Sequence, residues 1–211
     1  SVGKVMKYKA IVFDMDGTLL DTLSGIIKAC NLAFKHFGFD VTFTNEDGKY
    51  FIGAGSAEFA RRALDRANIP ELDLMEYRNV FLSNYEICQK TETKIFDGLD
   101  IILTKLKENG IKVAICSNKP QNLLNQVTAQ FYPKIKFDAI VGQRVGIPCK
   151  PDPKMFEITK QELGIESNDE ILYVGDSEYD FDFAKNSKVD ICIVKYGYGQ
   201  YEKDFMNHVT Y

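Results

Sequence analysis

The sequence Ala10-Ile11-Val12-Phe13-Asp14-Met15-Asp16-Gly17-Thr18 joins an apolar run directly to two aspartates and a glycine. Its first four residues have charge before them and Asp-Gly after them, which is typical of a short buried strand. In an extended chain residues two apart point to the same side, so Asp14 and Asp16 can face one crevice. Gly17 lets the backbone turn sharply after them. Because Asp-Gly is also a common surface turn, the stretch alone leaves that alternative open.

Four further apolar runs resemble the first, at residues 112–116, 139–141, 171–174 and 191–194. They do not alternate cleanly between apolar and polar residues, as expected of strands covered on both faces in a parallel sheet. Amphipathic helical patterns lie between them, at residues 98–109, 120–131 and 153–163. The alternation of strand and helix predicts an α/β core with a doubly wound, Rossmann-like parallel sheet.

Residues 20–90 break this alternation. They contain three helical patterns, at residues 24–37, 56–67 and 74–87, and no comparable strand. We therefore expect two domains: an α/β core formed by residues 1–20 and 91–211, and an all-helical domain inserted at residues 21–90.

Composition limits the classes of partner. The chain has 211 residues and a formal net charge of −4, which argues against nucleic acid or an anionic membrane as main partner. No run of about 18 apolar residues exists, so no membrane span is expected. The five cysteines are odd in number and widely spaced, which favours free thiols in a reducing compartment, and the cytoplasm is the expected location. The oligomeric state stays open.

Polar residues follow other predicted strands, where ligands bind in open α/β sheets. Ser117 and Asn118 follow the second core strand. They could bind phosphate oxygens at a helix start, or simply cap that helix. Lys150 lies between an apolar stretch and two prolines. Held beside a phosphoryl group it would stabilise negative charge, although a single lysine is more often solvated.

A second acidic pair follows the fourth core strand. Asp176 ends this strand as Asp14 ends the first, ready to share a hard cation that prefers oxygen ligands. Asp180 lies about one helical turn further on and can reach back to the same site. The alternative is an acidic helix N-terminus that the helix dipole favours. Together these residues form the inventory that transfers a phosphoryl group through an aspartyl-phosphate with Mg²⁺.

The four segments, in this order, resemble the signatures of the haloacid-dehalogenase superfamily, within its phosphatase branch. The resemblance implies that Asp14 is the nucleophile and that Asp16 is the general acid and base. It implies that Ser117 and Lys150 hold the phosphoryl group. It also implies that Mg²⁺ is bound by Asp14, the backbone carbonyl of Asp16 and Asp176.

The resemblance extends to the rest of the site. The helical insertion falls where the family has its helical cap of the C1 type, and Asp180 is expected in the second shell of the metal. Residues 51–56 with 62–64 are similar to the specificity segment of phosphoglycolate phosphatases. The substrate is then a small phosphorylated metabolite, with 2-phosphoglycolate as a candidate. Its predicted contacts are Gly17, Thr18, Asn118, Gly53, Ala54, Gly55 and Ser56. Arg61, Arg62 and Arg66 are expected to be solvated.

Two alternatives remain. A sugar phosphomutase of the same superfamily would share the core signatures, but Thr18 favours a phosphatase because mutase relatives tend to have valine there. A phospho-acceptor signalling domain also uses a parallel sheet, aspartates, a lysine and Mg²⁺. Such domains carry the phosphorylated aspartate after the third strand, whereas residues 139–144 end without one.

Overall fold

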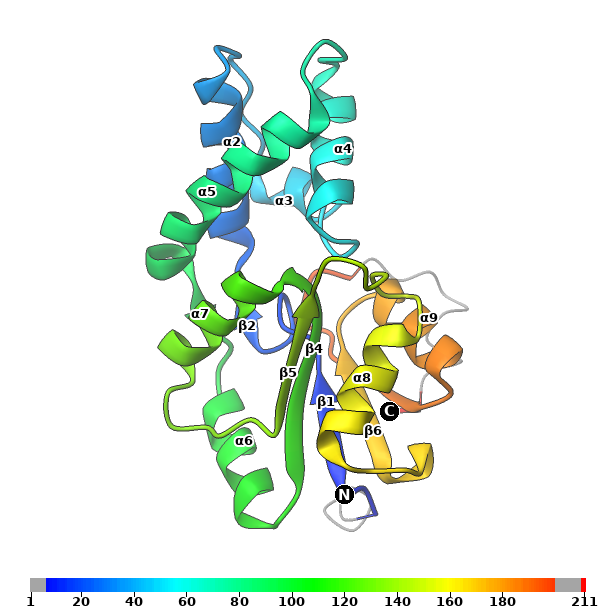
Figure 1. Ribbon diagram of the computed structural model, residues 1–211. Helices are drawn as coiled ribbons and strands as arrows, with labels where there is room; N and C mark the ends of the chain where they lie inside the picture. Colours follow the sequence, from blue (N-terminus) through cyan, green and yellow to red (C-terminus); the bar gives the residue numbers. More distant parts are fainter. Residues whose placement is uncertain (1–6, 200–209) are drawn as a thin grey trace.

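The computed structural model describes residues 7–199 and 210–211. Within them five strands form one parallel sheet in the order β5-β4-β1-β6-β7 (Figure 1). The predicted α/β fold with a doubly wound sheet is confirmed. The strands are β1 (Ala10–Phe13), β4 (Lys112–Pro120), β5 (Ala139–Gln143), β6 (Ile171–Gly175) and β7 (Asp190–Ile193).

Helices cover both faces of this sheet. Ile11 and Phe13 of β1 face the side of α6 (Leu99–Glu108) and α7 (Gln121–Phe131). Val12 faces the opposite side, against α8 (Lys154–Leu163) and α9 (Glu178–Ser187). Successive side chains of a strand point to opposite faces, and here both faces are buried. The strand runs are therefore continuously apolar.

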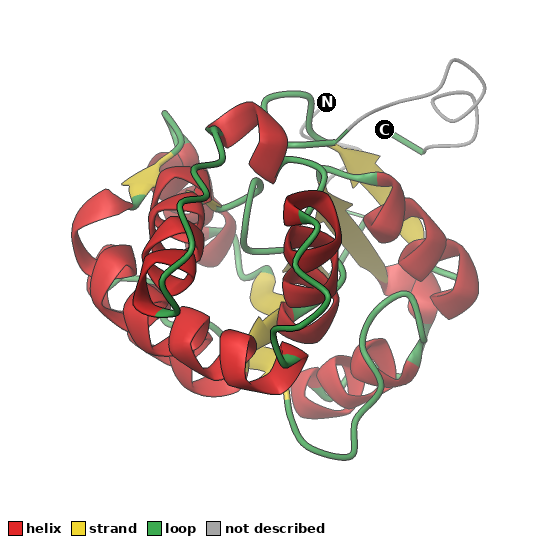
Figure 2. Cartoon of the chain, turned by 90° about the horizontal axis from the view of Figure 1, so that it is seen from above, coloured by secondary structure: helices red, strands yellow, loops and turns green. Residues whose placement is uncertain are grey.

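A second group of helices lies beyond the carboxyl ends of the strands (Figure 1). It comprises α2 (Leu23–His36), the short α3 (Asn45–Gly48), α4 (Ser56–Ala67) and α5 (Leu74–Glu92). Their buried apolar side chains form a cluster of their own. Figure 2 views the molecule from this end, with the strands lying between the helices. The three predicted helices are confirmed, and α5 continues beyond the predicted residue 87.

The chain enters and leaves the helical insertion side by side. β2 (Leu20–Asp21) pairs antiparallel with β3 (Lys94–Ile95), which closes the insertion at its base. The expected boundary between residues 20 and 21 falls within β2, and the boundary between 90 and 91 falls within the last turn of α5. We keep this two-domain division as a proposal.

β4 is longer than its apolar run, residues 112–116. It continues through Ser117 and Asn118 to Pro120, with an irregular register against β5 after Cys116. Helix α7 starts one residue later than expected, and its N-cap is Pro120, which offers no capping side chain. Neither Ser117 nor Asn118 caps the helix, so both side chains are available for other contacts. Within the described residues, no helix is long and apolar enough to cross a membrane.

Candidate active site

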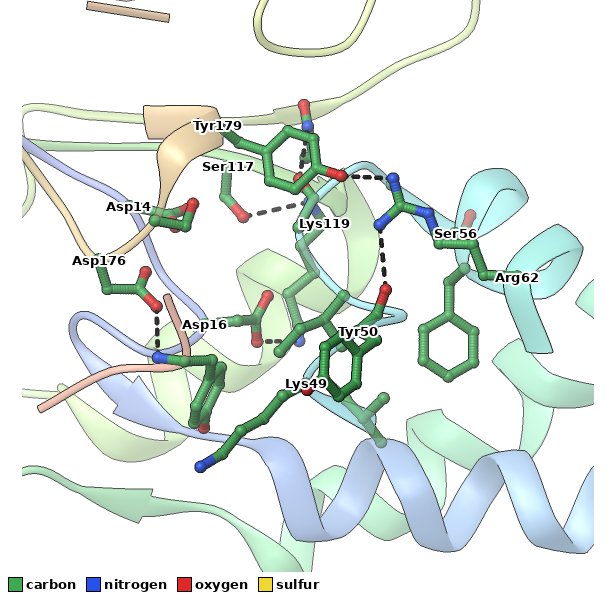
Figure 3. Close-up of a pocket in the computed structure, with 18 of the residues that line it drawn as sticks. Asp14, Asp16, Lys49, Tyr50, Ser56, Arg62, Ser117, Lys119, Asp176 and Tyr179 are labelled. Carbon is green, nitrogen blue, oxygen red and sulfur yellow. Dashed lines mark hydrogen bonds and ion pairs between the residues drawn. The ribbon is translucent and has the colours of Figure 1, made fainter. Parts of the chain in front are cut away.

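A cavity of about 250 Å³ lies between the carboxyl ends of the strands and the helical insertion (Figure 3). The core residues that line it include Asp14, Asp16, Ser117, Asn118 and Asp176, and the insertion contributes Gly53, Gly55 and Ser56. Residues spread over most of the chain therefore meet at one surface. Asp14 and Asp16 follow β1, the central strand, so the strands on both sides can supply partners.

Lys150 contacts Asp14 and is almost fully buried. Its Nζ donates to Asp14 Oδ1 at 3.0 Å, to Asp180 Oδ1 at 3.2 Å and to the Tyr173 hydroxyl at 2.8 Å. Burial lowers the pKa of Lys150, but the charges of Asp14 and Asp180 outweigh it and raise this pKa above its ordinary value. The lysine is therefore a fixed cation.

The side chain of Asn118 holds the segment that carries this lysine. Its Oδ1 accepts from the backbone N–H of Lys150 at 2.7 Å, and its Nδ2 donates to the backbone carbonyl of Lys150 at 3.0 Å. The same Nδ2 donates to the carbonyl of Gly53 in the insertion, also at 3.0 Å. One amide thus joins three segments that are far apart in the sequence.

Asp14, Asp176 and Asp180 bring carboxylate oxygens within 4.8 Å of one another. Burial, followed by the charge of Asp180, raises the pKa of Asp14 well above its ordinary value. The same two causes raise the pKa of Asp176 to about 7. Three carboxylates and the Lys150 ammonium leave two negative charges, which a divalent cation would cancel. The all-oxygen donor set fits Mg²⁺.

Both oxygens of Asp180 have protein partners. Oδ1 accepts from the Tyr173 hydroxyl at 2.5 Å as well as from Lys150, and Oδ2 accepts from the backbone N–H of Asp176 at 3.0 Å. Ser177 donates to Oδ2 through its backbone and its hydroxyl. Asp180 therefore orients Asp176 and Lys150.

Gly17 and Thr18 both contact the side chain of Asp176. The Thr18 hydroxyl donates to Asp176 Oδ1 at 2.9 Å, and a Cβ at Gly17 would overlap the same carboxylate. Gly17 also has a φ of +83°, which favours glycine. Neither residue lines the cavity, unlike the substrate contacts expected of them. Their contacts instead fix the position of Asp176.

Asp16 has different partners from Asp14. Its Oδ1 accepts from the Thr22 hydroxyl at 2.6 Å and from Lys119 Nζ at 3.0 Å. Lys119 is only 6% exposed, and its Nζ also lies 2.5 Å from the Tyr85 hydroxyl of α5. The sequence analysis missed Lys119. It directly follows Ser117 and Asn118, but its partners lie far away in the chain.

The insertion contributes the segment that leads into α4. Gly53 has a φ of +109°, and a Cβ there would lie 2.9 Å from the ring of Tyr179. Gly55 has a φ of +94° and is the N-cap of α4, and the Ser56 hydroxyl accepts from Arg78 Nε at 2.9 Å. Ala54, also expected to contact substrate, is not among the residues that line the cavity.

Arg62 is a correction to the sequence analysis, which expected a solvated charge. It lines the cavity and donates to Glu58 Oε1 at 3.0 Å, to the carbonyl of Tyr50 at 3.3 Å and to the hydroxyl of Tyr179 (Figure 3). Hydrogen bonds from Arg61 first, and then from Arg62, lower the pKa of Glu58 to about 2. The position of Glu58, four residues before Arg62 on one helix, could have predicted this ion pair from the sequence.

The chain is similar to known proteins of one family. The sequence model of the haloacid dehalogenase-like hydrolases matches residues 11–194. Phosphoglycolate phosphatases of Cereibacter sphaeroides and Aquifex aeolicus are 32% and 30% identical to the chain. These matches cover 89% and 90% of this chain and 85% and 86% of the relatives.

Solved structures agree with these matches. A candidate phosphoglycolate phosphatase from Lactobacillus delbrueckii subsp. bulgaricus superposes with a TM-score of 0.87 at 31% identity, covering 97% of this chain and 93% of that one. CbbY from Rhodobacter sphaeroides, solved with xylulose-(1,5)bisphosphate, has a TM-score of 0.79 at 20% identity, covering 93% and 90%. This second likeness concerns the fold alone. The described fold, the strand-end carboxylates and the match over residues 11–194 agree, and the chain belongs to the haloacid dehalogenase-like hydrolase family.

Proposed function

We propose that this protein is a Mg²⁺-dependent phosphomonoesterase that works through an aspartyl-phosphate on Asp14. The observation that carries the proposal is the half-buried Asp14 carboxylate, 3.0 Å from Lys150 and beside Asp176 and Asp180 at one end of the cavity. A carboxylate is a suitable phosphoryl acceptor, and catalysis of this transfer rests on positioning and charge stabilisation.

In the first step a carboxylate oxygen of Asp14 forms a bond to phosphorus, and the bond from phosphorus to the ester oxygen breaks. Asp16 gives a proton to the departing alcohol. In the second step Asp16 takes a proton from a water molecule whose oxygen bonds to phosphorus. Phosphate leaves and the Asp14 carboxylate is restored. Ser117 and Lys150 hold the non-bridging phosphate oxygens throughout.

Asp14, Asp176 and the backbone carbonyl of Asp16 would hold the metal. A bound Mg²⁺ supplies charge neutralisation for the phosphoryl group. Asp180 and Thr18 keep Asp176 in position through their contacts with it. The assignment is supported by the excess of two negative charges in the described carboxylate cluster.

The substrate is a small phosphorylated metabolite. Relatives named phosphoglycolate phosphatase make 2-phosphoglycolate one candidate. The cytoplasm is the proposed location, because the five cysteines all lie among the described residues and are all free, as expected in a reducing compartment.

The test is a phosphate-release assay over a panel of phosphomonoesters with Mg²⁺ present. We expect turnover, and a loss of at least about 1,000-fold in Asp14→Asn, which keeps the shape but removes the nucleophile. Asp100→Asn, an exposed aspartate on α6, is the control and should retain activity. Substantial turnover by Asp14→Asn would exclude Asp14 as nucleophile. Isomerisation of a sugar phosphate without phosphate release would instead identify a mutase.

A further inference from the structure

The part of the cavity that faces the helical insertion has apolar walls. Helices α2, α4 and α5 and the segment before α4 contribute Ile26, Ile52, Phe59, Phe81, Leu82 and Tyr85. The rings of Phe59 and Phe81 stack with centroids 4.5 Å apart and planes 14° apart. The ring of Tyr85 continues this arrangement, 5.9 Å and 15° from Phe81. An aromatic wall thus runs from α4 along α5.

Each cation that lines the cavity already has a carboxylate partner. Lys49 is 3.0 Å from Glu46, Arg62 is 3.0 Å from Glu58, and Lys119 is 3.0 Å from Asp16. These three carboxylates already neutralise the positive charge at this end of the cavity, which weakens the attraction for an anionic group on the far end of a substrate. Glu178 also lines the cavity and would repel it.

The cavity has room for more than a phosphoryl group. Its volume of about 250 Å³ equals the share of roughly eight water molecules in the liquid, at about 30 Å³ each. An alkyl or aryl group that enters this space would be stabilised in proportion to the apolar area that it removes from water.

We propose that the alcohol part of the substrate is uncharged and apolar, an alkyl or aromatic group that packs against Phe59, Phe81 and Leu82. The inference rests on the proposed phosphomonoesterase function and names its substrate class. Among the candidate substrates, we expect an apolar phosphomonoester to be preferred over 2-phosphoglycolate. The alcohol part of an ester whose phosphoryl group lies at Asp14 can reach these three side chains, because all four residues line the same cavity.

The experiment measures kcat/KM for the n-alkyl phosphates from ethyl to hexyl and for 2-phosphoglycolate, with Mg²⁺. The alkanols are similarly poor leaving groups, so differences along the series report binding in the transition state. We expect kcat/KM to rise about fourfold per methylene, the value for burying one CH₂, until the cavity is full. Longer members of the series should exceed 2-phosphoglycolate.

A matched pair of variants on one helix locates the effect. Leu82→Ser replaces part of the apolar wall and should reduce the rise per methylene. Ile87→Ser makes the same kind of change on α5 at a side chain that is 69% exposed and does not line the cavity, and it should keep the full rise. Equal slopes in both variants would contradict the proposed wall.

Binding of n-alkylphosphonates, measured by calorimetry, separates this inference from the proposed function. These compounds have no ester bond to hydrolyse, so their Kd reports the cavity even if no ester is turned over. We expect Kd to fall about fourfold per methylene. A flat series of Kd or kcat/KM values, or a preference for 2-phosphoglycolate, overturns the inference while phosphatase activity stands. A falling Kd without phosphate release from any ester overturns the proposed function alone.

Discussion

Asp14 and Asp16 lie two positions apart in the chain, but their carboxylates have different partners. Asp14 lies beside Lys150 and two further carboxylates, whereas Asp16 is bonded to Thr22 and Lys119. Two carboxylates in different surroundings can take different roles in one reaction. The arrangement favours Asp14 as nucleophile at the carboxylate cluster and Asp16 as the group that exchanges protons with the leaving oxygen.

Asp16→Asn separates these roles. If Asp16 protonates the leaving oxygen, we expect single-turnover phosphorylation by an alkyl phosphate to slow by about 100- to 10,000-fold. The same step with p-nitrophenyl phosphate should slow much less, because p-nitrophenolate leaves without a proton. Rapid-quench measurement of both substrates checks the ratio. Equal losses for the two would contradict the acid role.

Lys119→Met tests whether Lys119 acts through Asp16. The variant removes a charge-assisted hydrogen bond worth about 1.5–3 kcal/mol, so kcat/KM for alkyl phosphates should fall about 10- to 100-fold. The loss should again be smaller for p-nitrophenyl phosphate. In the Asp16→Asn background the same change should cost little more, because the two residues act as a unit. Additive losses would indicate a separate, structural role.

At the scale of elements, the segment between α3 and α4 meets the start of α9. Gly53 packs against Tyr179 of α9, and Arg62 of α4 bonds to the same tyrosine. The carbonyl of Gly53 also accepts from Asn118, which holds Lys150. The segment between α3 and α4 is therefore connected through a few side chains to the segment that carries Lys150.

Gly53→Ala should alter catalysis, and Gly98→Ala should not. Both glycines have a positive φ, so each substitution strains the backbone by about 1–2 kcal/mol and lowers the melting temperature. A Cβ at Gly53 also meets the ring of Tyr179, whereas a Cβ at Gly98 has no neighbour within 4 Å. Steady-state kinetics on the alkyl phosphate series should show a changed KM or kcat for Gly53→Ala alone. Equal kinetics in the two variants would show that the segment between α3 and α4 does not contribute to the active site.

At the scale of the whole molecule, the charge of the carboxylate cluster couples metal binding to stability. Asp14 follows β1, whereas Asp176 and Asp180 belong to the segment after β6, and these two segments approach one another only in the folded chain. A cation that binds this folded arrangement stabilises the protein by mass action. Burial first, and then the charge of Asp180, raise the pKa of Asp176, so the ionised cluster is unfavourable without a cation.

Divalent cations should therefore change both the melting temperature and the activity. Mg²⁺ at about 100 times its Kd contributes about 2.7 kcal/mol, which raises the melting temperature by roughly 5–10 °C. Asp176→Asn should reduce this rise. Chelator should abolish turnover, and Mg²⁺ should restore it better than Ca²⁺, which accepts more ligands and can engage both oxygens of Asp14. Full activity in excess chelator would contradict the metal assignment.

The strands and most helices were predictable, because hydrophobic periodicity is a local property of the sequence. The run at residues 10–13 and the pattern at residues 56–67 coincide with β1 and α4. Segments at strand ends also predicted that Asp14 and Asp176 would lie close together, since the carboxyl ends of parallel strands meet at one edge.

Tertiary structure alone decided which side chains meet across the cavity. The sequence shows Lys119 next to Ser117 and Asn118, but Asp16 lies 103 residues away, and only the pairing of β1 with β4 brings the two together. Arg62 has a local partner in Glu58, but its contact with Tyr179 spans 117 residues. In the sequence, the residues of the aromatic wall cannot be told from ordinary buried residues of a helix. Periodicity fixes which face of a helix is apolar, whereas the packing of the insertion on the sheet decides which part of that face lines a cavity.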